Sequence, residues 1–181
     1  MDVYPNGIRC LALRVRSAGF SLFELLIALS LASILLGVGV SSFSHVTDRI
    51  RFDADVAAVK GALSYARMKS VTRNERVIVC RWNGANGCTG HSARGHYQWV
   101  HGLAIFNDPN FNKILDTPSE SILKIVPFTQ LTNVVWSRGE VVAFKPNGSA
   151  LGYNGTFRLD IGQHRARLIL SMTGRLRYDA N

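Results

Sequence analysis

Three successive patterns of apolar and polar positions divide the chain. From Phe20 to Phe43 nearly every residue is apolar or small, and Glu24 is the single charged residue. A helix of about 20 apolar residues is long enough to cross the hydrocarbon core of a bilayer. The first pattern therefore predicts a membrane-spanning helix over residues 20–43.

The second pattern is amphipathic and follows the first directly. Apolar or small residues recur at alternating steps of four and three, which places them on one face of a helix. They are Phe52, Val56, Val59, Leu63, Ala66 and Ser70, and the charged residues Arg49, Asp53, Lys60 and Arg67 suit the wet face. We predict one helix from about Phe20 to about Arg73, on the order of 80 Å long, whose second half packs on a sheet.

The third pattern consists of short β-type runs that begin at Arg76. Asn83-Gly84, Asn147-Gly148 and Asn154-Gly155 are turn signals, and the Pro- and Asn-containing segment 107–121 is predicted to be a long surface loop. The predicted strands are Arg76–Trp82, Tyr97–Phe106, Ile122–Phe128, Val134–Trp136, Val141–Phe144, Thr156–Ile161, Ala166–Met172 and Arg175–Tyr178. The expected architecture is α+β, a long N-terminal helix packed on an antiparallel sheet.

The segment before the apolar run indicates which side of a membrane each part occupies. Arg9, Arg14 and Arg16 precede the run, so this segment is expected to stay in the cytoplasm while the rest is exported. A secretory signal has the small residues of its cleavage site after the apolar run. Here the small pair Ala18-Gly19 stands before it.

The junction Gly19-Phe20-Ser21-Leu22-Phe23-Glu24-Leu25-Leu26 resembles the class III leader junction of type IV pilins and type II secretion pseudopilins. The resemblance implies that prepilin peptidase cuts between Gly19 and Phe20 and methylates the amine of Phe20. A carboxylate inside a membrane helix is costly unless it is paired. For Glu24 the resemblance supplies a partner, the positive N-terminus of a neighbouring pilin during assembly. The alternative is a lone carboxylate tolerated near the interface.

Most of the chain after the leader resembles the GspH/FimT group of minor pilins and pseudopilins. The motifs are Leu63-Ser64-Tyr65-Ala66-Arg67 with Arg73, Val77-Ile78-Val79-Cys80 with Cys88, Trp99 and Gly102 before Ile105-Phe106, Phe144 with Gly148, and Gly174-Arg175-Leu176-Arg177. The resemblance implies the type IV pilin fold. Its parts would be a cleaved leader (1–19), a transmembrane and assembly helix (20–43) and a globular head (44–181), in which an amphipathic helix (44–73) precedes the sheet (76–181). Asp160 departs from the pattern, because relatives often carry another Cys there.

Two of the three cysteines lie after the leader. Cys80 and Cys88 fall on the exported, oxidising side, where disulfides persist, whereas Cys10 belongs to the leader. A bridge closing so small a loop is worth about 2.5 kcal/mol and is expected to pin a β-hairpin loop. A metal site is the alternative, because His91 and His96 lie close to Cys88. The two cysteines are too far apart for the short ligand spacing of structural zinc, so no metal and no cofactor is expected.

The charge balance favours polyanions or acidic surfaces as partners, although a charge of this size also aids solubility. The net charge is +9, and it becomes +7 without the three Arg and one Asp of the leader. Gly174-Arg175-Leu176-Arg177 resembles the C-terminal Gly-Arg-x-Arg element of the FimT subgroup, which is associated with DNA capture in natural transformation.

The C-terminal arginines suit contact with phosphates. In an extended strand Arg175 and Arg177 project from one face, and guanidinium forks can contact successive phosphates. Tyr178 could stack on an unpaired base, although a terminal Tyr more often packs against its strand neighbours. Further candidates for the same patch are Arg165, Arg167, Arg158, His164 and Lys145. The alternative interpretation is a solvated strand edge whose charges prevent aggregation.

No catalytic motif accompanies these features. The five His are scattered, and there is no nucleophile elbow and no phosphate-binding glycine loop, so an enzyme is not expected. We predict a minor type IV pilin that binds extracellular DNA non-specifically for uptake in natural transformation. The alternative is a structural minor pilin or a type II secretion pseudopilin that primes or caps filament assembly without binding DNA. The expected location is the inner membrane, with the head in the periplasm, and then the pilus at the cell surface.

Overall fold

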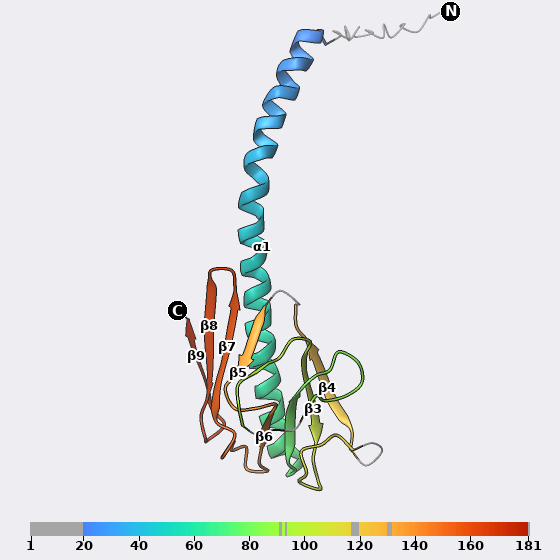
Figure 1. Ribbon diagram of the computed structural model, residues 1–181, viewed down its shortest axis with the longest axis vertical. Coiled ribbons are helices and arrows are strands. Elements are labelled where there is room, and N and C mark those ends of the chain that lie inside the picture. The colour runs from blue at the N-terminus through green and yellow to red at the C-terminus, as the bar shows by residue number, and fades with distance from the viewer. Residues whose placement is uncertain (1–19, 91, 93, 117–119, 130–131, 181) are drawn as a thin grey trace, which may run out of the picture. The chain divides into compact units, whose positions relative to one another are not determined.

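The computed structural model describes residues 20–90, 92, 94–116, 120–129 and 132–180, with side chains outside 36–45. The chain forms two compact units, Met1–Ser42 and Phe43–Asn181. Figure 1 shows the elements in chain order. The predicted leader, including Gly19, lies outside the described residues.

One long helix, α1 (Leu22–Arg73), contains 52 residues and confirms the predicted helix. The Ser21 hydroxyl accepts a hydrogen bond from the amide of Phe23 (3.2 Å), which caps the first turn. At the other end Asn74 adopts a left-handed backbone (φ 53°), and the amide of Glu75 returns to the carbonyl of Ser70 (3.2 Å). These bonds end the helix as a C-terminal cap does.

In the described part of the chain, no helix is long and apolar enough to cross a membrane. The predicted span includes residues 36–43, whose side chains lie outside the described part, and it stays a prediction.

The second half of α1 buries the predicted stripe. Phe52, Val56, Val59, Leu63 and Ala66 all belong to the main hydrophobic core. Asp55, a charged residue outside the predicted stripe, is also buried. Its carboxylate accepts hydrogen bonds from the amide (3.1 Å) and the hydroxyl of Thr129, so it fastens the helix to the segment after β4 (Ile122–Pro127).

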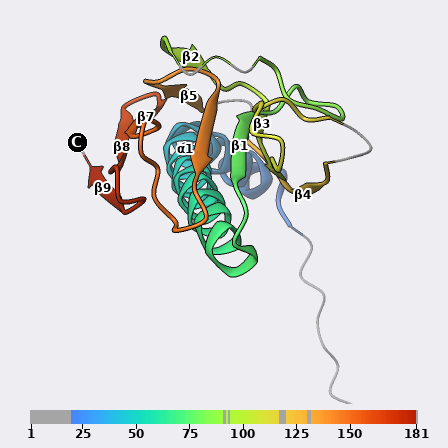
Figure 2. The ribbon, with the colours of Figure 1, turned by 90° about the horizontal axis from the view of Figure 1, so that it is seen from below.

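The strands form two antiparallel sheets rather than the single sheet expected. One has the order β4-β3-β1-β6 and the other β2-β5-β7-β8-β9. Figure 2 shows β9 and β4 at opposite margins of the layer of strands beside α1. The strands are β1 (Val77–Arg81), β2 (Tyr97–Gln98), β3 (Gly102–Asn107), β4 (Ile122–Pro127), β5 (Asn133–Trp136), β6 (Val141–Phe144), β7 (Gly155–Ile161), β8 (His164–Leu170) and β9 (Leu176–Ala180).

The predicted strand Tyr97–Phe106 was wrong, because two strands of different sheets occupy it. β2 pairs with β5, whereas β3 pairs with β1 and β4. Between them the amide of Trp99 still bonds to the carbonyl of Val134 (2.7 Å), and the chain then turns at Gly102 (φ 136°). A Cβ on Gly102 would lie 2.3 Å from the carbonyl oxygen of Val126, so glycine is required where the chain enters the second sheet.

Two hydrophobic clusters hold the head together. The larger lies between α1 and the sheets, where the rings of Trp136 and Phe157 stack at 4.2 Å and Trp99 meets Phe157 edge-on at 5.2 Å. The smaller cluster includes Ile78 and Phe106, and Leu115 of the loop between β3 and β4 packs against it. The four-stranded sheet is therefore covered on both faces, and β1 is buried along nearly its whole length.

The disulfide Cys80–Cys88 is present, with the two Cα atoms 5.7 Å apart. It closes a hairpin-like loop in which Asn83 Oδ1 accepts hydrogen bonds from the amides of Ala85 (2.9 Å) and Gly87 (3.2 Å). The predicted bridge and its Asn-Gly turn are thereby confirmed. His91 lies outside the described residues, within which no group of three or more His, Cys, Asp or Glu is arranged to hold a metal ion.

Candidate nucleic-acid interface

The five-stranded sheet has one face in the core and one in solvent. Along β7 and β8 the inward residues Phe157, Leu159, Ala166, Leu168 and Leu170 are buried. The residues that alternate with them point outward. Arg158, Arg165 and Arg167 are therefore exposed on one outer face of the sheet. Figure 1 shows β7 and β8 as neighbouring strands.

The last strand adds one arginine to this outer face. Arg177 lies opposite the outward residue Ile169 and is exposed. We call the set Arg158, Arg165, Arg167 and Arg177 the arginine face. Arg165 and Arg167 are about 6.7 Å apart along their strand, which is roughly twice the 3.4 Å axial spacing of phosphates in one DNA strand.

Acidic residues are interleaved with the arginines. Arg158 lies opposite Arg167 and Asp160 opposite Arg165 in the pairing of β7 with β8. Arg167 Nη2 lies 2.9 Å from Asp179 Oδ2 of β9, and both side chains are substantially exposed. Four arginines against Asp160 and Asp179 leave the face with a formal excess of two positive charges.

Arg175 borders the arginine face. β9 begins at Leu176, one residue later than predicted, so Arg175 precedes the strand. It lines a groove of about 610 Å³ between β9 and α1, together with the basic residues Lys60 and Arg67. The cationic surface therefore extends from the sheet to this groove.

The turn before Arg175 is built around Gly174. This residue is buried with φ +76°, and a Cβ there would lie 2.1 Å from the carbonyl oxygen of Gly148. The same oxygen accepts a hydrogen bond from Arg67 Nε (3.1 Å). The Arg67 side chain on α1 and the turns at Gly148 and Gly174 thus fix the position at which β9 starts.

Three other predicted candidates do not join the arginine face. His164 lies opposite the buried Ile161, and its ring contacts Phe52 at 5.9 Å on the core side. Tyr178 lies opposite the buried Leu168, so it is on the other face from Arg177. Lys145 is exposed in the turn that contains Gly148.

The described outer residues of β7, β8 and β9 include no aromatic side chain. Base stacking therefore has no platform on this part of the face. Guanidinium groups in rows on a sheet instead suit contacts with the phosphate backbone, which carry affinity but no sequence information.

Comparisons with known proteins point to one group. A family model described as "Type II transport protein GspH" matches residues 55–174, and a second, "Prokaryotic N-terminal methylation motif", matches residues 14–40. Among curated proteins, none matches the sequence. A crystal structure of the type IV minor pilin FimU of Pseudomonas aeruginosa strain PAO1 is similar, with a TM-score of 0.56 and 17% identity over 75% of this chain and 96% of FimU. Another crystal form of FimU gives a TM-score of 0.50 over 70% of this chain, again at 17% identity and over 96% of FimU. At this identity the likeness shows the pilin fold.

Proposed function

This chain belongs to the GspH family of type IV pilin-like proteins, and we propose that its arginine face binds extracellular DNA for uptake in natural transformation. A role like that of a minor pilin or pseudopilin follows from the family and the fold. The family and the structural neighbours are pilins, which are structural proteins rather than enzymes. The N-terminal motif and the family fit a pilus-associated, membrane-anchored protein.

One observation carries the DNA proposal: the four arginines of the arginine face are exposed together on one face of the five-stranded sheet. Each guanidinium can make a bidentate contact with a phosphate. The binding we propose is sequence-independent and strengthened by counterion release, so it weakens steeply with salt. Arg175, Lys60 and Arg67 beside the groove extend the surface along which a duplex backbone could lie.

The test is a titration of duplex DNA with the full-length chain in detergent micelles at several salt concentrations. Because Arg167 is paired with Asp179, the variant combines Arg165→Ala with Arg177→Ala. If each arginine meets one phosphate, the slope of log K against log salt falls by about 1.8. The control combines Arg51→Ala with Arg94→Ala, which removes the same charge from exposed sites off the sheet.

An equal loss in the control pair would mean that net charge, and not the arginine face, attracts DNA. If the unsubstituted chain does not bind DNA even at low salt, the DNA proposal is wrong and only the structural role in filament assembly remains. The single variant Arg175→Ala then tests whether the surface includes the groove beside β9.

A structural role in filament assembly is the second candidate. Phe20, just before α1, is widely exposed, and so are described apolar residues of the first half of the helix, including Leu22 and Phe23. We propose that they pack against the helices of other pilins after prepilin peptidase has cut before Phe20, with Glu24 pairing with a neighbour's N-terminus. In cells, the Arg165→Ala, Arg177→Ala variant should lose transformation while pili remain. Loss of pili in that variant would instead support a scaffold.

A further inference from the structure

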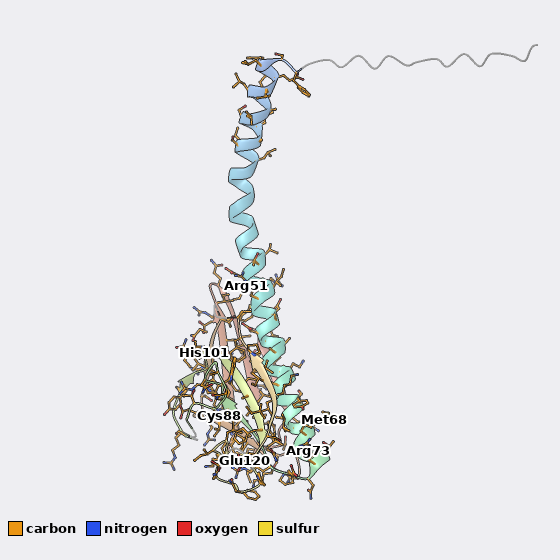
Figure 3. All side chains as sticks on the ribbon, turned by 90° about the vertical axis from the view of Figure 1, so that its right-hand side faces the viewer. Arg51, Met68, Arg73, Cys88, His101 and Glu120 are labelled. Atoms are coloured by element: carbon orange, nitrogen blue, oxygen red, sulfur yellow. A yellow bond between two sulfur atoms is a disulfide. The ribbon has the colours of Figure 1, made fainter. Side chains whose placement is uncertain are left out.

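The groove between β9 and α1 combines positive charge with an apolar floor. Its lining includes three cationic and three apolar side chains, Lys60, Arg67, Arg175, Met68, Val71 and Leu176. Met68 is 51% exposed and Val71 is 52% exposed, and Figure 3 shows Met68 near the C-terminal end of α1. Apolar side chains that are exposed together, next to charged groups, are typical of an interaction site, whereas single exposed ones need no explanation.

The cations make the groove attractive to an anion, and none of the described residues that line it is acidic. Arg67 is already held in place, because its Nε donates to the carbonyl of Gly148 (3.1 Å). A fixed side chain loses little freedom when it meets a ligand, so less of the binding free energy is spent on ordering it. Lys60 of α1 and Arg175 before β9 are exposed. A phosphate in the groove therefore meets positive charge from both elements.

An aromatic ring continues the apolar floor along β9. Leu176 and Tyr178 are two residues apart in this strand, so they lie on the same face of it, about 6.7 Å apart. That face is the inner one, because Tyr178 lies opposite the buried Leu168. β9 is the last strand of its sheet, and Tyr178 is 47% exposed. Aromatic rings that are exposed beside a cationic groove are the platforms on which unpaired bases stack.

The dimensions of the groove suit a single strand of DNA rather than a duplex. Its volume of about 610 Å³ lies within the range of pockets that hold small organic ligands. The bases of a duplex are paired and stacked in its interior, so only its phosphates can meet the cations. An unpaired nucleotide offers a phosphate to the cations and a base to the apolar floor. Arg175 borders both the groove and the arginine face, so one DNA strand can pass from the one to the other.

We propose that the groove holds an unpaired nucleotide at a single-stranded end of DNA. Its base stacks on Tyr178 beside Leu176, and its phosphates lie among the three cations of the groove. This inference rests on the proposed function and adds a preference to it: the arginine face contacts the duplex backbone, and the groove captures an unpaired end. Stacking tolerates any base, because every base has a π face. The preference is therefore for unpaired nucleotides and not for a sequence.

The experiment compares DNA probes that differ in one feature at a time. The full-length chain in detergent micelles is titrated with a fluorescent duplex that has a blunt end, an overhang of about four deoxyadenosines, or an abasic overhang of the same length. The two overhangs carry the same phosphates, and only the first has bases that can stack. The deoxyadenosine overhang should bind roughly 5–100-fold more tightly than the abasic one, which is the effect of one stacked base.

Three uncharged substitutions assign the site of the base. Tyr178→Leu keeps an apolar side chain without the ring and should lose most of the preference for the deoxyadenosine overhang, whereas Tyr178→Phe keeps the ring and the preference. The control is Phe111→Leu, which removes a ring that is 61% exposed in the segment after β3, on the other sheet. It should keep the preference. All three variants should bind the blunt duplex as the unsubstituted chain does, because no charge changes.

The outcomes separate this inference from the proposed function. Equal affinity for the two overhangs, with the blunt duplex still bound, would overturn the inference and leave DNA binding by the arginine face intact. A preference that survives in Tyr178→Leu would place the base elsewhere and would also overturn it. If no probe binds even at low salt, the proposed function is wrong, and this inference is wrong with it.

Discussion

Replacement of Gly174 by Ala tests how the turn before the arginines is built. The residue has φ +76°, in the left-handed region, and the added Cβ would lie 2.1 Å from the carbonyl oxygen of Gly148 and 3.0 Å from Arg67 Nε. The nearer atom belongs to the backbone, so the substitution cannot be accommodated by rotation of a side chain. Either the turn containing Gly148 or the start of β9 must move.

The expected cost has two parts. A left-handed conformation costs a residue with a Cβ about 1–2 kcal/mol. Forced displacement of packed neighbours adds about 1–3 kcal/mol. The total of about 2–5 kcal/mol corresponds to a fall in Tm of roughly 4–20 °C for a domain of this size.

Gly152 provides a matched control, because it has φ +89° and nothing lies within 4 Å of the position of its Cβ. Gly152→Ala should therefore show the conformational cost alone, about 1–2 kcal/mol. Thermal unfolding of the two variants and the unsubstituted chain, followed by circular dichroism, gives the comparison. If Gly174→Ala unfolds at the same temperature as Gly152→Ala, the contact with the Gly148 carbonyl does not constrain the turn and the reasoning fails.

Three further substitutions have defined outcomes. Asp179→Asn frees Arg167 and removes a negative charge, so DNA should bind more tightly, with a salt slope steeper by about 0.9. The free energy of unfolding should change by about 1 kcal/mol or less, because the ion pair is exposed. Weaker DNA binding by this variant would contradict the prediction. Replacing Cys80 and Cys88 together by Ser should cost about 2.5 kcal/mol, a fall in Tm of roughly 5–10 °C, and an unchanged Tm would mean that the bridge constrains nothing. Gly61→Ala on the exposed side of α1, with open space around its Cβ, should raise the free energy of unfolding by about 0.5–1 kcal/mol. A lower urea concentration at the unfolding midpoint would mean that the added Cβ clashes with a neighbouring group.

The helix was predictable because its signals are local. The alternating steps of four and three from Phe52 to Ser70 follow from the helical period alone, so the buried face could be predicted without any tertiary contact. The structure buries those positions. Asp55 was missed, since a charged residue is normally assigned to the wet face and its partner Thr129 is far along the chain. The division of Tyr97–Phe106 into β2 and β3 was missed for a related reason: both parts have β-type composition, and only the pairing partners separate them.

The arginine face was predictable in part. Alternation along a strand indicates that Arg165 and Arg167 share a face. Which residues of neighbouring strands lie opposite these arginines depends on the register between strands, and the sequence does not reveal that register. Register brings Asp179 opposite Arg167. His164 could have been excluded from the sequence, because alternation places it on the same face of β8 as the buried Ala166 and Leu168. The burial of Asp108 was not predictable either, because Asp is common in surface loops and its burial appears only in the fold.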